Sequence, residues 1–392
     1  MRVKIIALLW SAGVLLQAFE TPIGEFQTHV EFYYYDINTL GSNHENDAHA
    51  TAVGGFIAYR SIPLFEHFHL GYTHYLSYQL LDGKNPERTS LVGSAGKDIS
   101  PLVELYVDYS DKSWEMKLGK QRLDTPLIND DTTRLIPFSY EAINMHYRFD
   151  EQSLLTAGYV WRFRPICSEE YTRMTPSGYA EDGVGYLGFN TEFGDVQHQW
   201  YYYHAPQLYD ALHMQVESKT PYDTSKDIIY GVQAIYTFAN GEGNNIENHA
   251  NGGDDVQLLA AKLGLESSGF AWIASLSYNF GEDGISRGYG GLSSLYTSSM
   301  ITTGKSQGNP FAKSIKLRYT YDSASKKDAY TSALYLTNVT YSDPTLKDIN
   351  AIYIDHKFRF RPREYLHLRF ERQFIAGEAD RSYFRIISAY EF

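Results

Sequence analysis

Residues 26–34 read FQTHVEFYY, and apolar or aromatic residues alternate with more polar ones along this stretch. A β-strand places successive side chains on opposite faces, so the alternation predicts a strand with two different faces. One face carries Phe26, Thr28, Val30, Phe32 and Tyr34. The opposite face carries Gln27, His29, Glu31 and Tyr33. Such a strand separates an apolar environment from a wet one.

The same alternation recurs along the chain in segments of about ten residues, the length that spans a bilayer when strands tilt by about 45°. Examples are SWEMKLGK (113–120), LLTAGYVWRFR (154–164), IIYGVQAIYTF (228–238), KSIKLRYTY (313–321) and YLHLRFERQF (365–374). A soluble β-sandwich is the alternative, but its strands are shorter and its polar face points outward. At roughly twenty residues per strand and connection, about eighteen strands fit into the chain.

The N-terminal segment MRVKIIALLWSAGVLLQA (1–18) predicts a secretory signal peptide that is cleaved after Ala18. It combines the basic residues Arg2 and Lys4 with the apolar run 5–16. A membrane-anchoring helix is the alternative, but about twenty apolar residues are needed to span a bilayer. We therefore expect an exported protein whose mature domain covers residues 19–392.

The composition fits a membrane barrel better than a helical membrane protein. The chain has 34 Tyr, 21 Phe and 5 Trp, yet its mean hydropathy is only −0.38, as expected when only the lipid-facing half of each strand is apolar. Cys167 is the only cysteine, so no disulfide framework is possible. The net charge of −13 argues against nucleic acid as a partner.

The connections between the predicted strands differ in length. Short links such as 149–152 and 193–195 are typical of periplasmic turns, and long polar links such as 41–49, 167–183, 240–255 and 281–310 of extracellular loops. One long link contains candidate ligands for divalent cations shared with lipopolysaccharide, with a solvated acidic loop as the alternative. These carboxylates are Glu242, Glu247, Asp254 and Asp255.

The C-terminal segment SYFRIISAYEF (382–392) also alternates, and it ends on Phe392 within the predicted strand. A terminal aromatic residue of this kind is typical of bacterial outer-membrane proteins, whose assembly machinery recognises it. We therefore predict an all-β fold, a transmembrane antiparallel up-and-down barrel in a Gram-negative outer membrane, with Phe392 as the assembly signal.

Residues 118–149, LGKQRLDTPLINDDTTRLIPFSYEAINMHYRF, contain a strand ending near a glycine, a proline-containing stretch and an Arg-Leu-x-Pro step. This segment resembles the third-loop region of OprD-type outer-membrane porins. The matching residues are Gly119, Gln121, Pro126, Arg134, Leu135, Pro137 and Phe138. The segment departs from the family pattern at Glu141 and Ala142, where small or glycine residues are usual.

The resemblance implies an 18-stranded barrel whose third extracellular loop, near residues 122–139, folds inward and narrows the pore. It also implies passive uptake of small polar solutes such as carboxylates or amino acids. Candidate residues at the constriction are Asp124, Asp130, Asp131 and Arg134. Capping of the loop by these side chains is the alternative.

The resemblance further implies a wall of basic side chains along the pore. The alternation assigns to the inward face Lys117, Arg148, Arg162, Arg164, Lys316, Arg318, Lys357, Arg359, Arg369 and Arg385. Arginine presents a permanently charged fork that matches a carboxylate, and a row of weak sites allows an ion to pass. The alternative is that these bases only pair with inward acids such as Glu371 and Glu391.

Two other functions are alternatives to a diffusion pore. An outer-membrane hydrolase is disfavoured because the sequence has neither G-x-S-x-G nor H-E-x-x-H. His67 and His69 share a strand face but lack a third ligand, so we expect no metal site and no cofactor. A structural or adhesive barrel with a plugged lumen would instead use its long loops, and bilayer conductance distinguishes it from a pore. The choice between monomer and trimer stays open.

Overall fold

The computed structural model describes residues 19–41, 44–173, 183–206, 208–240, 253–284, 289–291, 295–302, 311–323, 329–361 and 363–391. These residues form one antiparallel sheet and two short 3₁₀ helices, η1 (Pro86–Thr89) and η2 (Ser94–Gly96). The strands of the first half are β1 (Phe19–Thr21), β2 (Gly24–Thr39), β3 (Ala48–Ser61), β4 (Phe68–Leu81), β5 (Leu102–Ser110), β6 (Trp114–Gln121), β7 (Ser139–Arg148), β8 (Ser153–Arg164), β9 (Thr172–Arg173) and β10 (Val184–Phe193). Those of the second half are β11 (Val196–Ala205), β12 (Tyr209–Asp223), β13 (Lys226–Ala239), β14 (Gln257–Ser267), β15 (Phe270–Asn279), β16 (Ala312–Asp322), β17 (Ala329–Tyr341), β18 (Ile349–Arg361), β19 (Glu364–Ile375) and β20 (Arg381–Glu391).

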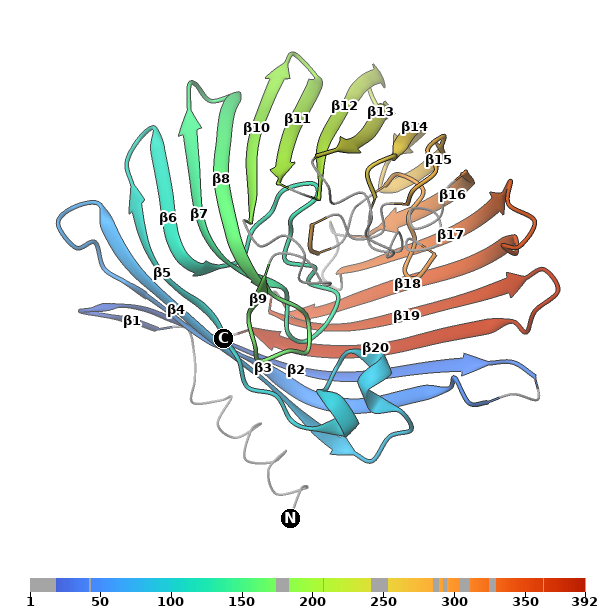
Figure 1. Ribbon diagram of the computed structural model, residues 1–392, viewed down its shortest axis with the longest axis horizontal. Coiled ribbons are helices and arrows are strands. Elements are labelled where there is room, and N and C mark those ends of the chain that lie inside the picture. The colour runs from blue at the N-terminus through green and yellow to red at the C-terminus, as the bar shows by residue number, and fades with distance from the viewer. Residues whose placement is uncertain are drawn as a thin grey trace.

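The sheet closes on itself into a barrel (Figure 1). Each long strand pairs with the next along the chain, β8 pairs directly with β10, and β20 returns to pair with β2. The short strands β1 and β9 are additions to this ring, which therefore contains eighteen strands. The predicted all-β barrel of about eighteen strands is confirmed.

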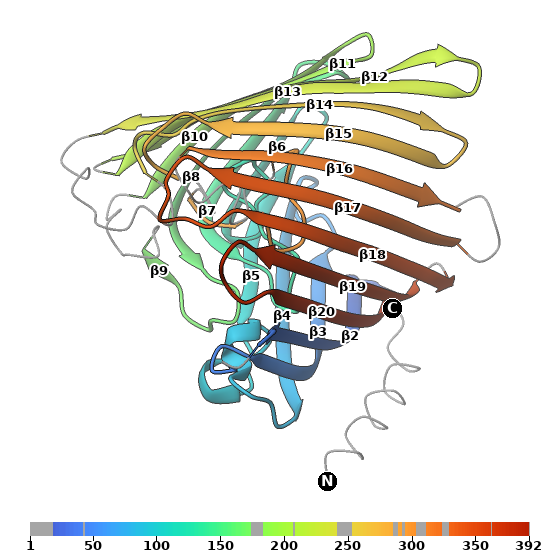
Figure 2. The same cartoon turned by 90° about the vertical axis from the view of Figure 1, so that its right-hand side faces the viewer.

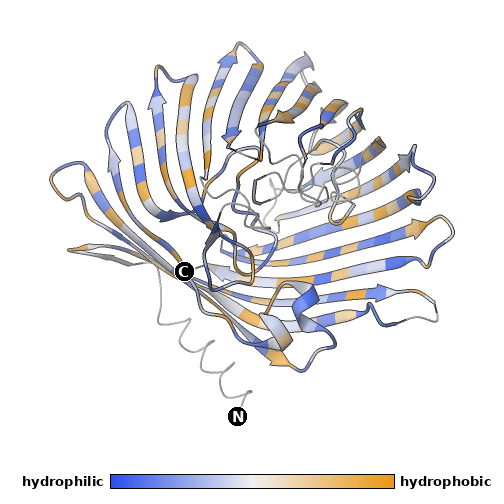
Figure 3. Cartoon of the chain, viewed as in Figure 1, coloured by the Kyte–Doolittle hydropathy of each residue, from blue (hydrophilic) through white to orange (hydrophobic). Residues whose placement is uncertain are grey.

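The alternation of the sequence becomes an inside and an outside of the barrel. On β16, Ile315 and Leu317 are 62% and 40% exposed, whereas the intervening Ser314 and Lys316 are 1% and 7% exposed. Hydropathy switches in the same way along many strands in Figure 3. The apolar side chains are the exposed ones because they point outward, where lipid would surround a barrel of this kind.

The two ends of the barrel differ (Figure 2). Tight turns such as 194–195 and 268–269 lie at one end, and the longer connections lie at the other. Aromatic rings gather on the outer face near the tight turns, where Trp114 lies 4.6 Å from Tyr147 and Phe270 lies 4.5 Å from Tyr321. Such belts are typical of a membrane interface.

No helix in the part of the chain that the structure describes is long and apolar enough to cross a membrane. The predicted signal peptide, residues 1–18, and the predicted assembly signal, Phe392, lie outside the described residues.

Candidate pore and constriction

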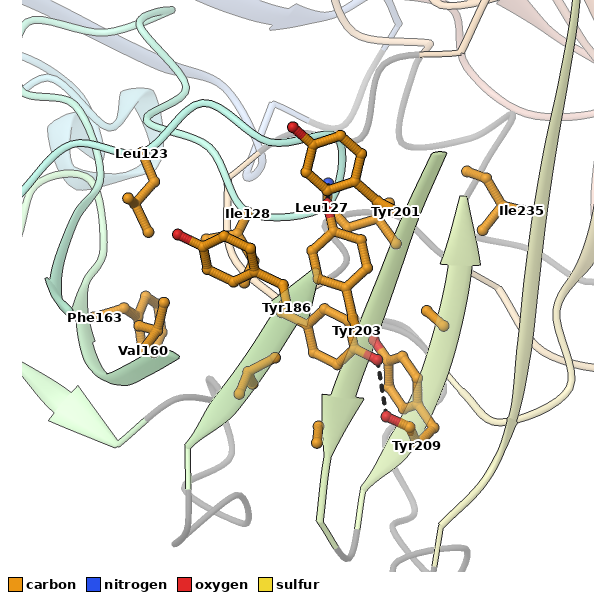
Figure 4. Packing of buried hydrophobic residues seen from close by; sticks show 14 of the residues in the cluster. Leu123, Leu127, Ile128, Val160, Phe163, Tyr186, Tyr201, Tyr203, Tyr209 and Ile235 are labelled. Carbon is orange, nitrogen blue, oxygen red and sulfur yellow. Dashed lines mark hydrogen bonds between the residues drawn. The ribbon is translucent and has the colours of Figure 1, made fainter. Parts of the chain in front are cut away.

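The connection between β6 and β7, residues 122–138, folds into the barrel (Figure 1). Its tip is held by Tyr203 on β11, whose hydroxyl accepts a hydrogen bond from the Leu127 amide at 3.1 Å and donates one to Thr125 at 3.0 Å. Leu123, Leu127 and Ile128 are buried against tyrosines from β10 to β12 (Figure 4). Apolar side chains thus fasten this loop inside the barrel.

The connection between β15 and β16 also enters the barrel and contacts the first loop. The Asn129 amide donates to the Gly290 carbonyl at 3.2 Å, and the Tyr289 amide donates to the Leu127 carbonyl at 3.1 Å. Gly291 has φ +89°, and a Cβ there would lie 2.2 Å from the Asn129 carbonyl oxygen. Only glycine fits such a position without strain, so the close approach of the loops depends on it.

Glu371 on β19 anchors the later part of the β15–β16 connection. Its fully buried carboxylate accepts hydrogen bonds from Ser299 Oγ at 2.9 Å and from the amides of Ile301 at 2.9 Å and Thr302 at 3.1 Å. Gln373 Nε2 donates to the same group at 2.8 Å. The buried carboxylate is thus hydrogen-bonded to donors of the loop and to a neighbouring side-chain amide, and not to an arginine.

A cavity of about 410 Å³ lies between these loops and the wall formed by β11 to β17. Pro126 and Leu127 line it from the first loop, and Leu295, Tyr296 and Ser298 from the second. The wall contributes Gln199, His213, Gln215, Glu217, Gln233, Ile235, Lys262, Ile273, Ser275, Lys316, Arg318 and Tyr335. The lining is therefore mostly polar and includes three cationic side chains and one carboxylate.

The charges of this cavity have defined partners. Lys262 Nζ lies 2.7 Å from Glu217 Oε1 and 4.4 Å from the centre of the Tyr296 ring. Lys316 Nζ donates to the Ser298 carbonyl at 2.6 Å. Arg318 on β16 lies opposite Tyr335 on β17. The Arg318 Nε has no hydrogen-bond partner among the described residues. Only one of the three cations is thus neutralised by a carboxylate within the lining.

Arg134 and Arg385 meet around one tyrosine on the other side of the first loop. Their guanidinium carbons lie 5.0 Å and 4.4 Å from the centre of the Tyr35 ring. Arg134 Nε also donates to the Thr89 carbonyl at 2.9 Å. Burial and the charge of Arg385 lower the pKa of Arg134, although an arginine stays charged. The negative face of the aromatic ring stabilises both cations.

The acidic residues of the first loop have local roles. Asp130 Oδ2 lies 3.5 Å from Arg122 Nη1, and burial raises the pKa of Asp130. Asp131 has φ +38° and accepts a hydrogen bond from the Thr133 amide at 3.2 Å. Asp124 forms an isolated bridge with Asn129 near the tip. These contacts shape the loop whether or not the side chains meet a solute.

A β-bulge changes the assignment of Arg162 and Arg164. The register between β7 and β8 shifts between Glu141 and Ala142, so that Ala142 pairs with Val160 and Glu141 with Arg162. Val160 and Phe163 are both buried in the interior cluster, which places Arg162 on the outer face. The inward orientation expected for Arg162 and Arg164 assumed that the alternation is unbroken. Because the bulge contains one extra residue, the positions after it change from one face of the strand to the other.

Arg164 is fully buried beneath the connection that follows β8. Its guanidinium donates to Ser139 Oγ at 3.1 Å, to the carbonyls of Pro165 and Ser168 at 2.9 Å each, and to the Pro137 carbonyl. These bonds tie the strand end to two loops, so Arg164 has a structural role.

The remaining predicted bases lie on inward positions closer to the tight turns. Lys117 lies 4.3 Å from the centre of the Tyr106 ring, and Lys357 lies 3.7 Å from that of Tyr365. Arg369 Nε is 3.3 Å from Asp355 and donates to the Tyr353 hydroxyl at 2.8 Å. The exposed bases at the rim of the barrel are Arg148 and Arg359.

Two of the four carboxylates proposed for a cation site, Glu242 and Glu247, lie outside the described residues. Asp255 accepts hydrogen bonds from the Glu282 amide at 3.1 Å and from Gln257 Nε2 at 2.9 Å. Burial and the neighbouring Asp283 raise the pKa of Asp254. Among the residues that the structure describes, no group of three or more His, Cys, Asp or Glu side chains could hold a metal ion.

Sequence reasoning missed several residues of the cavity. Lys262 and Glu217 were not among the candidates, although alternation with Leu263 on β14 and with Met214 on β12 would place both inward. The inward path of residues 289–291 and 295–302 was missed because a Gly- and Ser-rich stretch also fits a solvated loop. The apolar side chains of Tyr289 and Leu295 were the available sign in the sequence that this stretch enters the barrel, since both are buried in the structure.

The closed barrel with two inward loops belongs to the class of 18-stranded transmembrane-type β-barrels. No protein-family model and no curated protein matches the sequence. Solved structures do match over nearly the whole chain. OccK9 (OpdG) of Pseudomonas aeruginosa superposes with a TM-score of 0.82 at 16% identity, covering 96% of this chain and 100% of that one.

Two further structures agree. OccAB3 of Acinetobacter baumannii has a TM-score of 0.78 at 14% identity, covering 94% of this chain and 99% of that one. OpdK of Pseudomonas aeruginosa, solved with vanillate, has a TM-score of 0.77 at 14% identity, covering 94% and 98%. These proteins are OprD/Occ-type porins, so the fold is the one that the resemblance of residues 118–149 predicts.

Proposed function

We propose that this chain is an outer-membrane porin through which small polar solutes, preferably anions, diffuse passively. The observation that carries the proposal is the cavity between the loops and the wall, in which Lys262, Lys316 and Arg318 outnumber Glu217. A cation in a confined polar site attracts anions and raises their local concentration. The proposed place of the protein is the outer membrane, reached through the signal at residues 1–18.

The solutes proposed are small carboxylates and amino acids. Arg318 lines the cavity, and a carboxylate matches the guanidinium fork in shape and charge. Glu217 would receive the ammonium group of an amino acid. The glutamines of the wall offer both donors and acceptors. A volume of about 410 Å³ accommodates such a solute together with water. The OpdK structure holds vanillate, itself a carboxylate.

The proposed constriction consists of the connections after β6 and after β15, because these two segments occupy the lumen and bond to each other. Arg134, Asp124, Asp130 and Asp131 belong to the first of them. The proposed basic wall starts from Lys316 and Arg318 and continues through Lys357, Arg359 and Arg369 toward the tight turns.

Single-channel recording in planar bilayers tests the proposal. The wild-type chain is expected to give discrete openings, and under a salt gradient its reversal potential is expected to indicate anion preference. The double variant Lys316→Gln and Arg318→Gln removes two cationic charges from the cavity. Two unit charges 4 Å apart interact with about 4 kcal/mol at an effective dielectric of about 20. Removal of the two cationic charges should therefore lower the preference for anions over cations by at least tenfold.

The matched control is Arg361→Gln together with Lys226→Gln, which removes two exposed cations at the tight turns. Its reversal potential should stay close to that of the wild type. A silent bilayer with folded protein would refute the pore. Equal reversal potentials for wild type and cavity variant would refute the role of the cavity.

A further inference from the structure

Four carboxamide side chains form a row across four neighbouring strands. Asn190 on β10 lies opposite Gln199 on β11. Gln199 lies opposite Gln215 on β12, which in turn lies opposite Gln233 on β13. Cross-strand partners have their side chains on the same face of a sheet. With strands about 4.8 Å apart, this amide row extends over roughly 14 Å.

The amide row lies on the inner face of the barrel. Trp200 and Val232, which are neighbours of the row on β11 and β13, are 51% and 58% exposed and belong to the outer face. All members of the row except Asn190 line the cavity between the loops and the wall. All members except Gln233 line a second cavity of about 250 Å³. The row therefore faces the space through which a solute would move.

The two cavities meet at the amide row. Gln199, Gln215 and Glu217 line both of them. The second cavity continues to Glu151 and Gln152 in the tight turn before β8. A solute that moves along this wall between the inward loops and the tight turns therefore passes the row.

The amide row has hydrogen-bonding groups left for a solute. Gln233 Nε2 donates to Gln215 Oε1 at 2.8 Å, and Asn190 Nδ2 donates to the Tyr201 hydroxyl at 3.1 Å. Gln199 makes no hydrogen bond to any residue that the structure describes, and the NH₂ group of Gln215 makes none within the same part of the chain. A carboxamide has an acceptor oxygen and two donor hydrogens. The row thus presents both donors and acceptors to the cavities.

The amide row is uncharged, and its nearest charged neighbours neutralise each other. Glu217, two residues after Gln215, binds Lys262 on β14 at 2.7 Å. Lys316 and Arg318 lie on β16, three strands beyond the end of the row. Anions are attracted to these cations. The row, in contrast, offers hydrogen bonds without charge.

An aromatic ring stands beside the amide row. Tyr296, from the connection after β15, lines the first cavity. Its hydroxyl reaches Gly231, which is two residues from Gln233 and shares its face of β13. A Cβ at residue 231 would lie 2.8 Å from the Tyr296 hydroxyl oxygen, so the glycine leaves room for this side chain. Ring and row together offer an apolar surface next to polar groups.

We propose that the amide row, together with the Tyr296 ring, binds neutral solutes rich in hydroxyl groups, namely monosaccharides. A hydroxyl group donates one hydrogen bond and accepts two, so it pairs with either end of a carboxamide. The C–H groups on one side of a sugar ring pack against an aromatic face. Each contact contributes weakly because it replaces bonds to water, and a row of weak sites permits passage. The inference rests on the proposed pore but concerns solutes that its cations do not attract.

Uptake of labelled arabinose into proteoliposomes that contain the full chain tests the inference. Triethylene glycol is the comparison solute, because it is also neutral and of nearly the same mass but has fewer hydroxyl groups. Uptake by protein-free liposomes is subtracted. Arabinose uptake should approach a maximum as its concentration rises, as expected for a binding site. Uptake of triethylene glycol should rise in proportion to concentration.

The row variant, Gln199→Met with Gln215→Met, removes two amides at nearly constant side-chain length. Its arabinose uptake at low concentration should fall on the order of tenfold, since several hydrogen bonds are lost. The matched control is Gln27→Met with Gln257→Met, which changes two exposed glutamines that line neither cavity. Its uptake should equal that of the wild type.

Arabinose uptake that stays proportional to concentration in the wild type would overturn the inference. Equal uptake by the row variant and the wild type would do the same, as would equal losses in the row and control variants. If the row variant lacks the mobility shift of a folded barrel in unheated gels, the single change Gln199→Met replaces it.

The inference and the proposed function fail in different ways. Anion-selective openings in planar bilayers without saturable arabinose uptake would refute the inference alone. Saturable arabinose uptake together with cation-selective openings would refute the proposed anion preference alone. A silent bilayer without uptake of either solute would refute the pore itself.

Discussion

Cys167 lies in the connection after β8, where its Sγ donates to the Ser90 carbonyl at 2.5 Å. Burial raises the pKa of this thiol to about 12. Because only the thiolate reacts with iodoacetamide, alkylation at pH 8 should be on the order of a thousandfold slower in the folded protein than in the unfolded chain. Mass spectrometry after timed quenching gives both rates.

The variant Cys167→Ser serves as the control, since it should take up no label in either state. Equal rates of alkylation before and after unfolding would contradict the burial of the thiol. The reaction therefore also reports whether the connections after β4 and β8 pack together in solution.

Orientation of single residues could be predicted from the sequence only where the strands are regular. Lys316 and Arg318 lie on the inner face, as the alternation with Ile315 and Leu317 predicts. Arg162 does not, because one extra residue at the bulge reverses every later position of the strand. In the sequence VWRFR, Val160 and Trp161 are adjacent apolar residues, and this break in the alternation is the local sign of the bulge.

At the scale of elements, Glu371 is the strongest link between the β15–β16 connection and the wall. The change Glu371→Gln leaves one acceptor oxygen and places an NH₂ group near loop amides that also donate. Hydrogen bonds to a charged group contribute about 1.5–3 kcal/mol each, so the connection should loosen. Single-channel recordings should show larger conductance and more noise in the open state.

The control for this change is Glu364→Gln, which neutralises the carboxylate of the first residue of β19, beside Arg361 at the tight turn. It should leave the recordings as they are in the wild type. Identical traces for Glu371→Gln and wild type would show that the connection does not narrow the pore.

The inward loops illustrate what local sequence can and cannot predict about elements. The path of residues 122–138 was predicted through a resemblance that includes Pro126 and Arg134. The path of residues 289–291 and 295–302 was not, since Gly290, Gly291, Ser298 and Ser299 suit water and a polar lumen equally well. Glu371, which the alternative to the basic wall made a partner for arginines, instead accepts hydrogen bonds from backbone amides that are distant in sequence.

At the scale of the whole molecule, the barrel depends on pairing between its first and last long strands. Asn38 on β2 lies opposite Ser382 on β20. Opposed residues in antiparallel strands have Cα atoms about 4.5–5.5 Å apart, within the range of a disulfide. The double change Asn38→Cys and Ser382→Cys, made with Cys167→Ser, should therefore form a cross-link. A change in gel mobility after heating, reversed by a reductant, reports it.

The combination Asn38→Cys and Ser388→Cys is the matched control, because Ser388 lies opposite Phe32, which is six residues before Asn38 on β2. It should not cross-link. Cross-linking of the control but not of the opposed pair would contradict the register of the closing strands.

The fold as a whole could be predicted because its signal repeats. Each strand repeats the same division into an apolar and a polar face, so an error in one segment hardly changes the strand count. The cavity could be predicted only in part, because its lining combines strands far apart in the sequence, such as those of Glu217 and Lys316. Distances between such residues follow from the curvature of the barrel and not from any local pattern.

The two inward loops are joined by their own backbone groups, through Asn129 and Gly290 and through Leu127 and Tyr289. The barrel wall carries the charged side chains of the cavity, and the loops carry the contact that would limit the opening of the proposed pore. Size limit and charge preference therefore depend on separate parts of the chain. If the proposed pore is correct, mutation can alter one property without the other, so size limit and charge preference can change independently.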